Sequence, residues 1–147
     1  MKQISLILFL LQTILLNAQA PADVDLSFGL HPGFNGDVNT IVTQPDGKIL
    51  VGGSFITYKG IPQNYFIRLN SDGTKDETFD VGNKLNNSVY TIQLQPDGKI
   101  LVGGSFTTFQ GVTQNNLIRL NTDGSKDNTF DIGTGFNNSV RTIQLQP

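Results

Sequence analysis

Two segments of the chain place several oxygen-bearing side chains around a glycine. They are residues 70–76 (NSDGTKD) and 121–127 (NTDGSKD). A hard cation such as Ca²⁺ takes several carboxylate and carbonyl oxygens on a sharp turn, so calcium binding is one interpretation. The spacing differs from the EF-hand pattern D-x-[DN]-x-[DN]-G, and Asp-Gly already has a reason to occur in a hairpin turn. We therefore expect no cofactor, with calcium as the alternative.

The other residue types that could support catalysis are scarce. His31 is the only histidine and lies beside Pro32, so neither a Ser/His/Asp site nor a two-histidine metal site can be built around it. The chain has no cysteine, which excludes disulfides and thiolate metal ligands. No glycine run has the context of a P-loop or a dinucleotide fingerprint. We expect no catalytic residue and predict that the chain is not an enzyme.

The first twenty residues have the pattern of a secretory signal peptide. Lys2 precedes a mainly apolar run at 4–16, and Ala18-Gln19-Ala20 gives the small residues of a cleavage site. A membrane anchor is the alternative, but this run is too short to cross roughly 30 Å of hydrocarbon. We predict cleavage after Ala20, or after Ala18, and a secreted or cell-surface protein whose mature chain has no membrane span.

The charge of the remaining chain argues against nucleic acid as a partner. Twelve acidic and nine basic residues follow position 20, so the net charge is 9 − 12 = −3. There is no basic run, and clustered Lys and Arg are what a nucleic-acid-binding surface requires.

A repeat of 51 residues organises everything after the lead-in. The string QPDGKILVGGSF occurs at 44–55 and again at 95–106, and 34 of 51 positions are identical between 38–88 and 89–139. A period of this size indicates a solenoid, a propeller or another array. The predicted organisation is a lead-in (21–37), two full repeats (38–88 and 89–139) and the start of a third (140–147).

Each period is expected to contain four short strands. In the second repeat the strands are predicted at 88–95, 99–106, 115–121 and 126–131. Pro-Asp-Gly at 96–98 and Asp123-Gly124 predict tight turns, the first with a glycine bulge. Residues 107–114 are predicted to be looser. Gly103-Gly104 indicates either close approach of another backbone or a bulge.

Four antiparallel strands per unit describe a blade of a β-propeller. A β-solenoid is the alternative, but its coils are usually shorter and tight hairpin turns would be unusual between its parallel strands. We predict an all-β fold: a β-propeller fragment with four-stranded antiparallel blades, comprising two full blades and the first strand of a third.

The motifs at 89–106, 119–124 and 127–130, with an earlier full copy at 38–79, resemble the delta-60 type β-propeller repeat. The resemblance covers 23–147. It implies a multi-bladed propeller in large exported or surface proteins of Gram-negative bacteria, and other blades of the same propeller as partners. The activity of that family is not established, so the resemblance carries over no catalytic residue. With this resemblance, the chain is expected to be an N-terminal fragment of a longer protein or a truncated reading frame.

Sequence differences between the repeats suggest where a partner could bind. The first and third turns of a four-strand meander share one end of the blade, and the copies differ at the opposite end, in 56–65, 83–87, 107–116 and 134–138. Binding residues tend to lie on loops held by a rigid scaffold, although loops also vary without function. The candidate recognition residues are Lys59, Tyr65, Lys84, Gln110, Asn116 and Phe136.

The expected function is a non-catalytic exported module, a structural scaffold or a binding or adhesion surface for a protein or glycan. The alternative is the propeller part of a secreted hydrolase or lyase whose catalytic residues lie outside this chain. A blade without a neighbour exposes apolar surface, so we also predict that residues 21–147 alone are marginally stable, oligomeric or aggregated.

Overall fold

Ten short strands and no α-helix make up the part of the chain that the computed structural model describes, which is residues 33–79, 81 and 84–146. The predicted signal peptide, His31 and residues 21–32 of the predicted lead-in lie outside these residues. The all-β expectation is confirmed, and every strand pairing is antiparallel.

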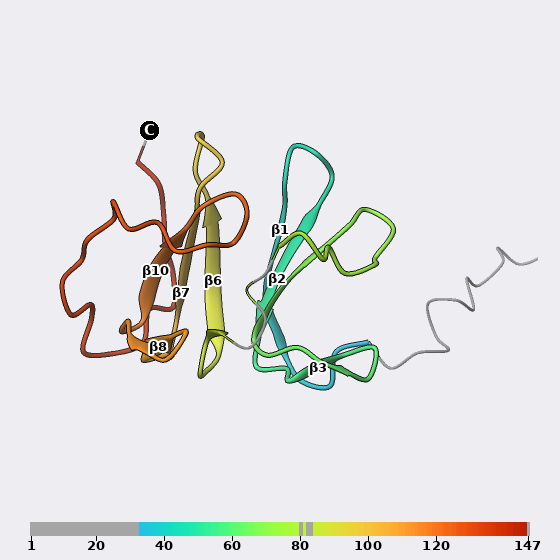
Figure 1. The fold of residues 1–147 in the computed structure, drawn as a ribbon, viewed down its shortest axis with the longest axis horizontal. Coiled ribbons are helices and arrows are strands. Elements are labelled where there is room, and N and C mark those ends of the chain that lie inside the picture. Colours follow the sequence, from blue (N-terminus) through green and yellow to red (C-terminus); the bar gives the residue numbers. More distant parts are fainter. Residues whose placement is uncertain (1–32, 80, 82–83, 147) are drawn as a thin grey trace, which may run out of the picture. The chain divides into compact units, whose positions relative to one another are not determined.

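Each repeat contributes one three-stranded sheet with the same topology (Figure 1). In repeat 1 the order is β1-β2-β5, formed by Val38–Thr43, Ile49–Gly53 and Phe66–Leu69. In repeat 2 the order is β6-β7-β10, formed by Val89–Leu94, Ile100–Gly104 and Leu117–Leu120. The 51-residue sequence repeat is therefore a structural repeat.

The Pro-Asp-Gly turns have the predicted geometry. In repeat 1 the Gly47 N–H donates to the Gln44 carbonyl at 2.9 Å, and the Gln44 N–H donates to the Lys48 carbonyl at 2.8 Å. Gly47 has φ of 83°, a conformation that glycine adopts without steric cost. Asp46 Oδ1 accepts from the Lys48 N–H at 3.1 Å, which favours aspartate in the turn.

The fourth strand predicted at 126–131 is wrong, because only Lys126 pairs back there, through an isolated bridge to Leu120, and the copy in repeat 1 behaves in the same way. After β5, only Lys75 pairs back to the sheet, through an isolated bridge to Leu69. The next residue, Asp76, accepts on its Oδ1 from the N–H and the hydroxyl of Thr78 at 3.0 and 2.6 Å, and this local bonding turns the chain. Phe79 then packs edge-on against Phe66, with ring centroids 5.7 Å apart. The segment leaves the sheet edge because its side chains make local bonds and core contacts instead of a ladder.

The stretch predicted to be loose holds a small hairpin in each repeat. In repeat 1 it is formed by β3 (Thr57–Tyr58) and β4 (Ile61–Pro62), and in repeat 2 by β8 (Thr108–Phe109) and β9 (Val112–Thr113). The two-residue loop Lys59-Gly60 has φ of 50° and 78°. Positive φ at both positions is the requirement of a type I′ turn, which joins antiparallel strands tightly.

Both interpretations of the Gly-Gly pair, close approach of another backbone and a bulge, hold for its second glycine, while the first glycine is approached by side chains. A Cβ added at Gly52 would lie 2.5 Å from Cγ1 of Val89, so this glycine admits the next repeat. A Cβ at Gly53 would collide with the carbonyl oxygen of Asp37. The register of β1 against β2 shifts at the same place, between Val38 and Thr40. The second glycine therefore accommodates a β-bulge.

The two repeats stack through opposite sides of their sheets. We call the side that bears Val38 and Ile41 the leading face of repeat 1, and the side that bears Gly52 its trailing face. Val89 and Ile92, the copies of Val38 and Ile41 on the leading face of repeat 2, contact Gly52 and are 0% and 4% exposed. Val38 and Ile41 are 39% and 63% exposed. The same residue types are thus buried only where a neighbouring repeat covers them.

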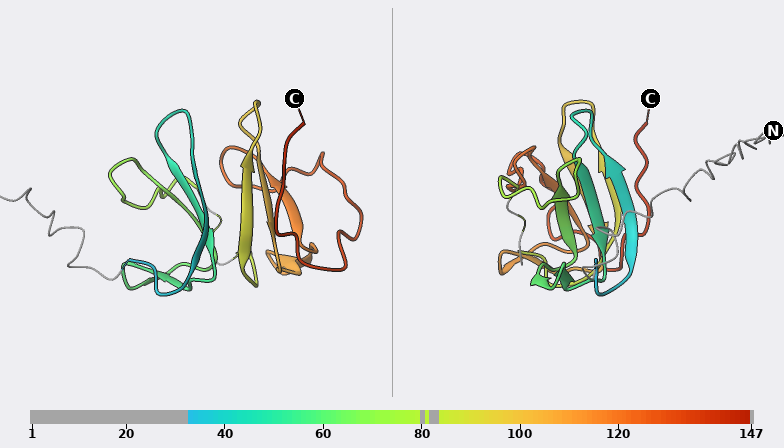
Figure 2. Two further views of the ribbon diagram at one scale, coloured as in Figure 1. Left: turned by 180° about the vertical axis from the view of Figure 1, so that it is seen from behind. Right: turned by 90° about the vertical axis from the view of Figure 1, so that its right-hand side faces the viewer.

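Most of the core lies at this junction. One cluster combines residues of both repeats, including Leu50 and Phe66 with Val102 and Ile118. A smaller cluster around Val51 packs on the leading side of repeat 1. Figure 2 shows the two sheets from behind and from the side.

Residues 140–146, predicted as the first strand of a third blade, form no ladder. The Val140 N–H donates to the Gly104 carbonyl at 3.0 Å, and a Cβ at Gly103 would lie 2.7 Å from Cγ1 of Val140. The segment thus takes the position on repeat 2 that β6 takes on repeat 1. No described segment pairs with it as β2 pairs with β1 and β7 pairs with β6.

Candidate functional site

The two ends of each repeat differ in structure (Figure 1). The Pro-Asp-Gly and Asp-Gly turns lie towards one end, which we call the turn end. The hairpins β3–β4 and β8–β9 lie at the other, which we call the hairpin end. The predicted recognition loops belong to the hairpin end, and the turns that are identical in the two copies belong to the turn end.

Lys59 and Gln110 occupy matching positions at the tips of the two hairpins. Both have left-handed backbones, with φ of 50° and 53°, and both side chains are exposed. Lys59 Nζ lies 5.4 Å from the centroid of the Tyr58 ring. The conformation that the type I′ turn imposes is the same in both repeats, while the side chain differs.

Tyr65 and Asn116 also match in position, but they point inward. Their φ values are 63° and 66°. Asn116 is buried, and its Nδ2 donates to the Gly104 carbonyl at 3.1 Å. Tyr65 is half-buried and packs against the main core, and its N–H donates to the Phe55 carbonyl at 2.9 Å. Both residues anchor the start of the third sheet strand.

Lys84 and Phe136 lie in the links that follow the repeats. The Lys84 carbonyl accepts from the Gln110 N–H at 2.7 Å, so these two candidates are neighbours. Lys84 Nζ is 6.0 Å from the centroid of Phe109. Phe136 is 51% exposed, whereas its copies are covered: Leu85 is buried and bridges to Phe109, and Phe34 packs 4.4 Å from Phe55. Phe136 therefore occupies a position that packs under a hairpin in the other two copies.

An asparagine clamp holds each hairpin, and the sequence analysis missed it. Asn35 Oδ1 accepts from the N–H groups of Ile56 and Thr57, both at 2.8 Å. Asn86 Oδ1 accepts from those of Thr107 and Thr108 at 2.8 and 3.1 Å. The clamp comes from the segment that precedes each repeat. The available signal was the recurrence of asparagine 51 residues later.

A glutamine covers the outer edge of each sheet, and it too was missed. Gln63 Nε2 donates to the Phe66 carbonyl at 2.7 Å, and Gln114 Nε2 donates to the Leu117 carbonyl at 2.6 Å. In both repeats the carbonyl belongs to the first residue of the edge strand. The side-chain amide bonds an edge group that a fourth strand would otherwise pair with, which protects the edge.

The aspartates of the predicted calcium segments have internal hydrogen-bond partners. Asp72 Oδ1 accepts from the hydroxyl and the N–H of Thr74 at 2.7 and 2.9 Å. The Thr74 hydroxyl bond is the main reason why the pKa of Asp72 is lowered. Asp123 has the same arrangement with Ser125. Within the described part of the chain, no three His, Cys, Asp or Glu side chains come together as metal ligands.

Asp76 is the centre of a buried charged cluster. Its Oδ2 accepts from Lys48 Nζ at 2.8 Å and from Arg68 Nε at 2.7 Å. Burial alone would raise the pKa of Asp76, but the bonds from Lys48, Thr78 and Arg68 outweigh it, and the pKa is lowered. Asp127 repeats the cluster with Lys99 and Arg119, and the Thr129 hydroxyl is the largest cause of its lowered pKa.

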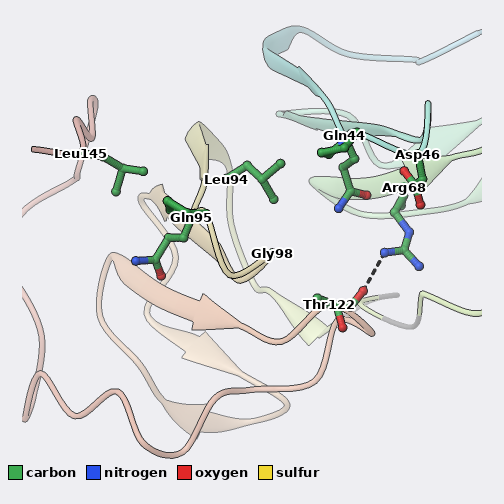
Figure 3. A pocket seen from close by; sticks show the side chains of 10 residues that line it. Gln44, Asp46, Arg68, Leu94, Gln95, Gly98, Thr122 and Leu145 are labelled. Carbon is green, nitrogen blue, oxygen red and sulfur yellow. Dashed lines mark hydrogen bonds between the residues drawn. The ribbon is translucent and has the colours of Figure 1, made fainter. Parts of the chain in front are cut away.

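A cleft of about 590 Å³ opens at the turn end, between the two repeats (Figure 3). Gln44, Asp46 and Arg68 of repeat 1 line it. Leu94, Gln95 and Thr122 of repeat 2 face them across it. Arg68 Nη1 donates to the Thr122 carbonyl at 2.6 Å and so links the two repeats at the cleft. The guanidinium also stacks on Phe79, 4.2 Å from its centroid.

In the described residues, no helix is long and apolar enough to span a membrane.

Comparison with known proteins identifies the repeat. Residues 44–79 and 95–130 match the family described as Domain of unknown function (DUF5122) beta-propeller. Each match runs from the first turn of a repeat through its two remaining sheet strands to the phenylalanine that follows them, Phe79 in the core or its half-buried copy Phe130. No curated protein and no solved structure matches the chain. Both repeats of this chain belong to a β-propeller repeat family.

Proposed function

We propose that the chain is a non-catalytic exported module, with blades of the delta-60 type, that presents its hairpin end as a binding or adhesion surface for a protein or glycan. The observation that carries the proposal is the contrast within that end. The clamping residues Asn35 and Asn86 are the same in both repeats, whereas the exposed tips differ, as Lys59 and Gln110 show. A fixed frame with variable tips is an arrangement that serves recognition.

The internal partners of the carboxylates support a role without catalysis or a cofactor. Asp76 and Asp127 are each neutralised by a lysine and an arginine. We therefore expect that adding EDTA leaves the melting temperature unchanged in a thermal melt followed by circular dichroism. A drop that calcium restores would instead support a metal site at the Asp-Gly turns.

Exchange of the hairpin tips tests the binding surface. Lys59→Gln and Gln110→Lys each introduce the residue that the other repeat already carries at the same φ, so the fold should be retained. We expect the double variant to lose binding to an array of immobilised glycans and extracellular proteins that the parent chain recognises. Asp97→Asn, at the turn end, is the control and should bind like the parent. Unchanged binding by the double variant would contradict the proposal.

Export is tested separately. A culture that expresses the full chain should release a product whose first residue is Pro21, as N-terminal sequencing would show. A product that keeps Met1 and stays inside the cell would contradict export.

A further inference from the structure

A pocket of about 300 Å³ opens on the leading face of repeat 1. Tyr58 and Ile61 of the hairpin β3–β4 line one side of it, and Thr74, which follows the Asp-Gly turn, lines the other. Ile67 of β5 also lines the pocket and belongs to the smaller core cluster. The apolar walls of the pocket are therefore continuous with the core of repeat 1.

The matching position on repeat 2 is covered by the end of repeat 1. Phe109, the copy of Tyr58, is 3% exposed and lies in one core cluster with Phe79 and Val81. A Cβ added at Gly124, in the Asp-Gly turn of repeat 2, would lie 3.1 Å from the Phe79 ring and 3.2 Å from Cγ1 of Val81. These two side chains come from the segment that follows the sheet of repeat 1, and they close the pocket of repeat 2.

The turn beside the pocket of repeat 1 has no such cover among the described residues. Gly73 is the copy of Gly124, and a Cβ added to it would meet the hydroxyl oxygen of Tyr58 at 3.9 Å and no closer atom. Gly124 is buried, whereas Gly73 and Tyr58 are half-buried. Because the two positions are copies of each other, repeat 2 shows the chemistry of the missing cover. It is a phenylalanine followed two residues later by a β-branched aliphatic residue.

A second segment of this kind lies at the end of repeat 2. Residues 127–132 (DNTFDI) are the copy of 76–81 (DETFDV) and carry Phe130 and Ile132 at the two apolar positions. In both segments the phenylalanine N–H donates to the aspartate carbonyl at 3.2 Å. Phe130 and Ile132 are half-buried, whereas their copies in 76–81 are 2% and 1% exposed. The segment thus has the local bond of its copy and is still partly accessible, which reduces the ordering cost of binding.

We propose that the pocket on repeat 1 binds Phe130 and Ile132 of a second copy of the chain. Within one copy, Phe79 and Val81 make this contact from repeat 1 to repeat 2. Between copies, the equivalent segment of repeat 2 makes it to repeat 1 of the next copy, so the existing interface continues in the same direction. The contact lies on the leading face and requires no partner at the hairpin end.

The test is a titration of the purified chain, in dilute solution, with a synthetic peptide of residues 126–134 (KDNTFDIGT). The ring resonances of Tyr58 and the methyl resonances of Ile67 are followed by NMR. We expect the peptide to shift both with a Kd of roughly 1 mM or below. The same peptide with F130A should bind at least about tenfold more weakly, because it lacks the larger of the two apolar side chains.

A matched pair of variants separates binding from folding. Ile61 lines the pocket, Val112 is its copy on repeat 2, and both are 65% exposed. Ile61→Lys should weaken peptide binding at least about tenfold, whereas Val112→Lys should bind like the parent chain. Both should melt like the parent, because substitutions at exposed positions change stability little. In analytical ultracentrifugation, Ile61→Lys and Phe130→Ala should each weaken self-association at least about tenfold, and Val112→Lys should leave it unchanged.

The proposal is overturned if the peptide shifts neither resonance up to roughly 10 mM, tenfold above the expected limit. It is overturned as well if Ile61→Lys and Val112→Lys bind the peptide equally. Residues 25–30 (DLSFGL) are an earlier copy of the same segment. If the peptide bound the Phe28→Ala variant but not the parent chain, the pocket would belong to that segment of the chain itself, and the second copy would be excluded as its occupant.

Discussion

Asp76 connects three parts of repeat 1 through one carboxylate. Lys48 immediately precedes β2, Arg68 lies on β5, and Thr78 lies in the segment that leads to the core phenylalanine. Arg68 continues the network to the Thr122 carbonyl of repeat 2. Removing one member of a buried ion pair leaves the other charge buried and uncompensated. The resulting loss of folding free energy exceeds the net stabilisation that the intact pair provides.

Asp76→Asn should therefore lower the free energy of unfolding by about 3 kcal/mol, because it leaves the buried Arg68 guanidinium without its carboxylate. Urea unfolding followed by circular dichroism measures the change. Asp127→Asn should cost less, since Arg119 is more exposed than Arg68. Asp46→Asn, in an exposed turn, is the control. An Asp76→Asn variant as stable as the control would show that the cluster contributes nothing.

Acid should weaken the fold through the same two carboxylates. Their pKa values are lowered in the folded state from an ordinary 3.8, so the unfolded chain takes up protons first as the pH falls. The stabilisation is fully present above the unfolded value and is lost progressively below it, towards the folded values. Urea midpoints measured from pH 7 down to pH 2 should be flat at first and fall below about pH 4. The Asp76→Asn/Asp127→Asn variant should show a smaller fall, and an equal fall would implicate other groups.

At the scale of the elements, β1 and β6 have the same repeat position and opposite surroundings. Ile92 on β6 is buried against repeat 1, while Ile41 on β1 is exposed on the leading face. The chain thus contains a matched pair of isoleucines that differ only in whether a neighbouring repeat covers them.

Ile92→Ala should lower the free energy of unfolding by about 3 kcal/mol, through lost burial and the cavity that remains. Ile41→Ala should change it by no more than about 0.5 kcal/mol, as an exposed substitution does. Chemical denaturation of both variants gives the comparison. Equal effects would contradict the stacking of the repeats.

Prediction from the sequence was right for the regular sheet strands of each repeat. It was wrong where local side-chain hydrogen bonds compete with strand pairing. Strands β1 and β6 were predictable from alternation, and β2 and β7 from the apolar segments that follow the Pro-Asp-Gly turns. The Gly-Gly pair correctly indicated close approach. The fourth strand was wrong because the side chain of Asp76 bonds to its own neighbour Thr78 and turns the chain. The β-propensity of a short segment cannot show that competition.

The candidate site was less predictable than the strands. Variation between the copies located the hairpin end, but it gave Asn116 the same weight as Gln110, although one is buried and the other lies at an exposed tip. The two-residue strands of the hairpins were too short to give a period. The cleft depends on Gln44 and Leu94 meeting across two repeats, which is a property of packing and not of any local pattern.

At the scale of the whole molecule, the repeats associate head to tail. The trailing face of repeat 1 covers the leading face of repeat 2, so the two contacting surfaces are different. Among the described residues, none covers Val38 and Ile41 on the leading face of repeat 1. On repeat 2, residues 140–146 cover the trailing face only in part, since Val140 and Phe130 are half-buried where Val89 and Phe79 are buried. Such contacts can continue from one copy of a chain to the next.

We therefore expect the purified chain to self-associate in a concentration-dependent way, as analytical ultracentrifugation would detect. Ile41→Lys should shift the population towards the monomer, because it places a charge on the leading face. Lys75→Ala, which removes a surface charge elsewhere, is the control. A parent chain that sediments as a monomer and melts sharply and reversibly would contradict the prediction.

Because of the asparagine clamp, the unit to copy when engineering longer arrays begins a few residues before the sequence repeat does. Each hairpin is fastened by a residue that lies before the repeat begins, Asn35 for the first and Asn86 for the second. A cassette cut at 38–88 would carry Asn86 but leave its own hairpin without Asn35. If each cassette instead starts before the clamp, near residue 33 or 84, every hairpin stays in the same cassette as its clamping asparagine. Arrays lengthened in that frame should fold, whereas arrays joined in the sequence frame would depend on the residues placed before their first cassette.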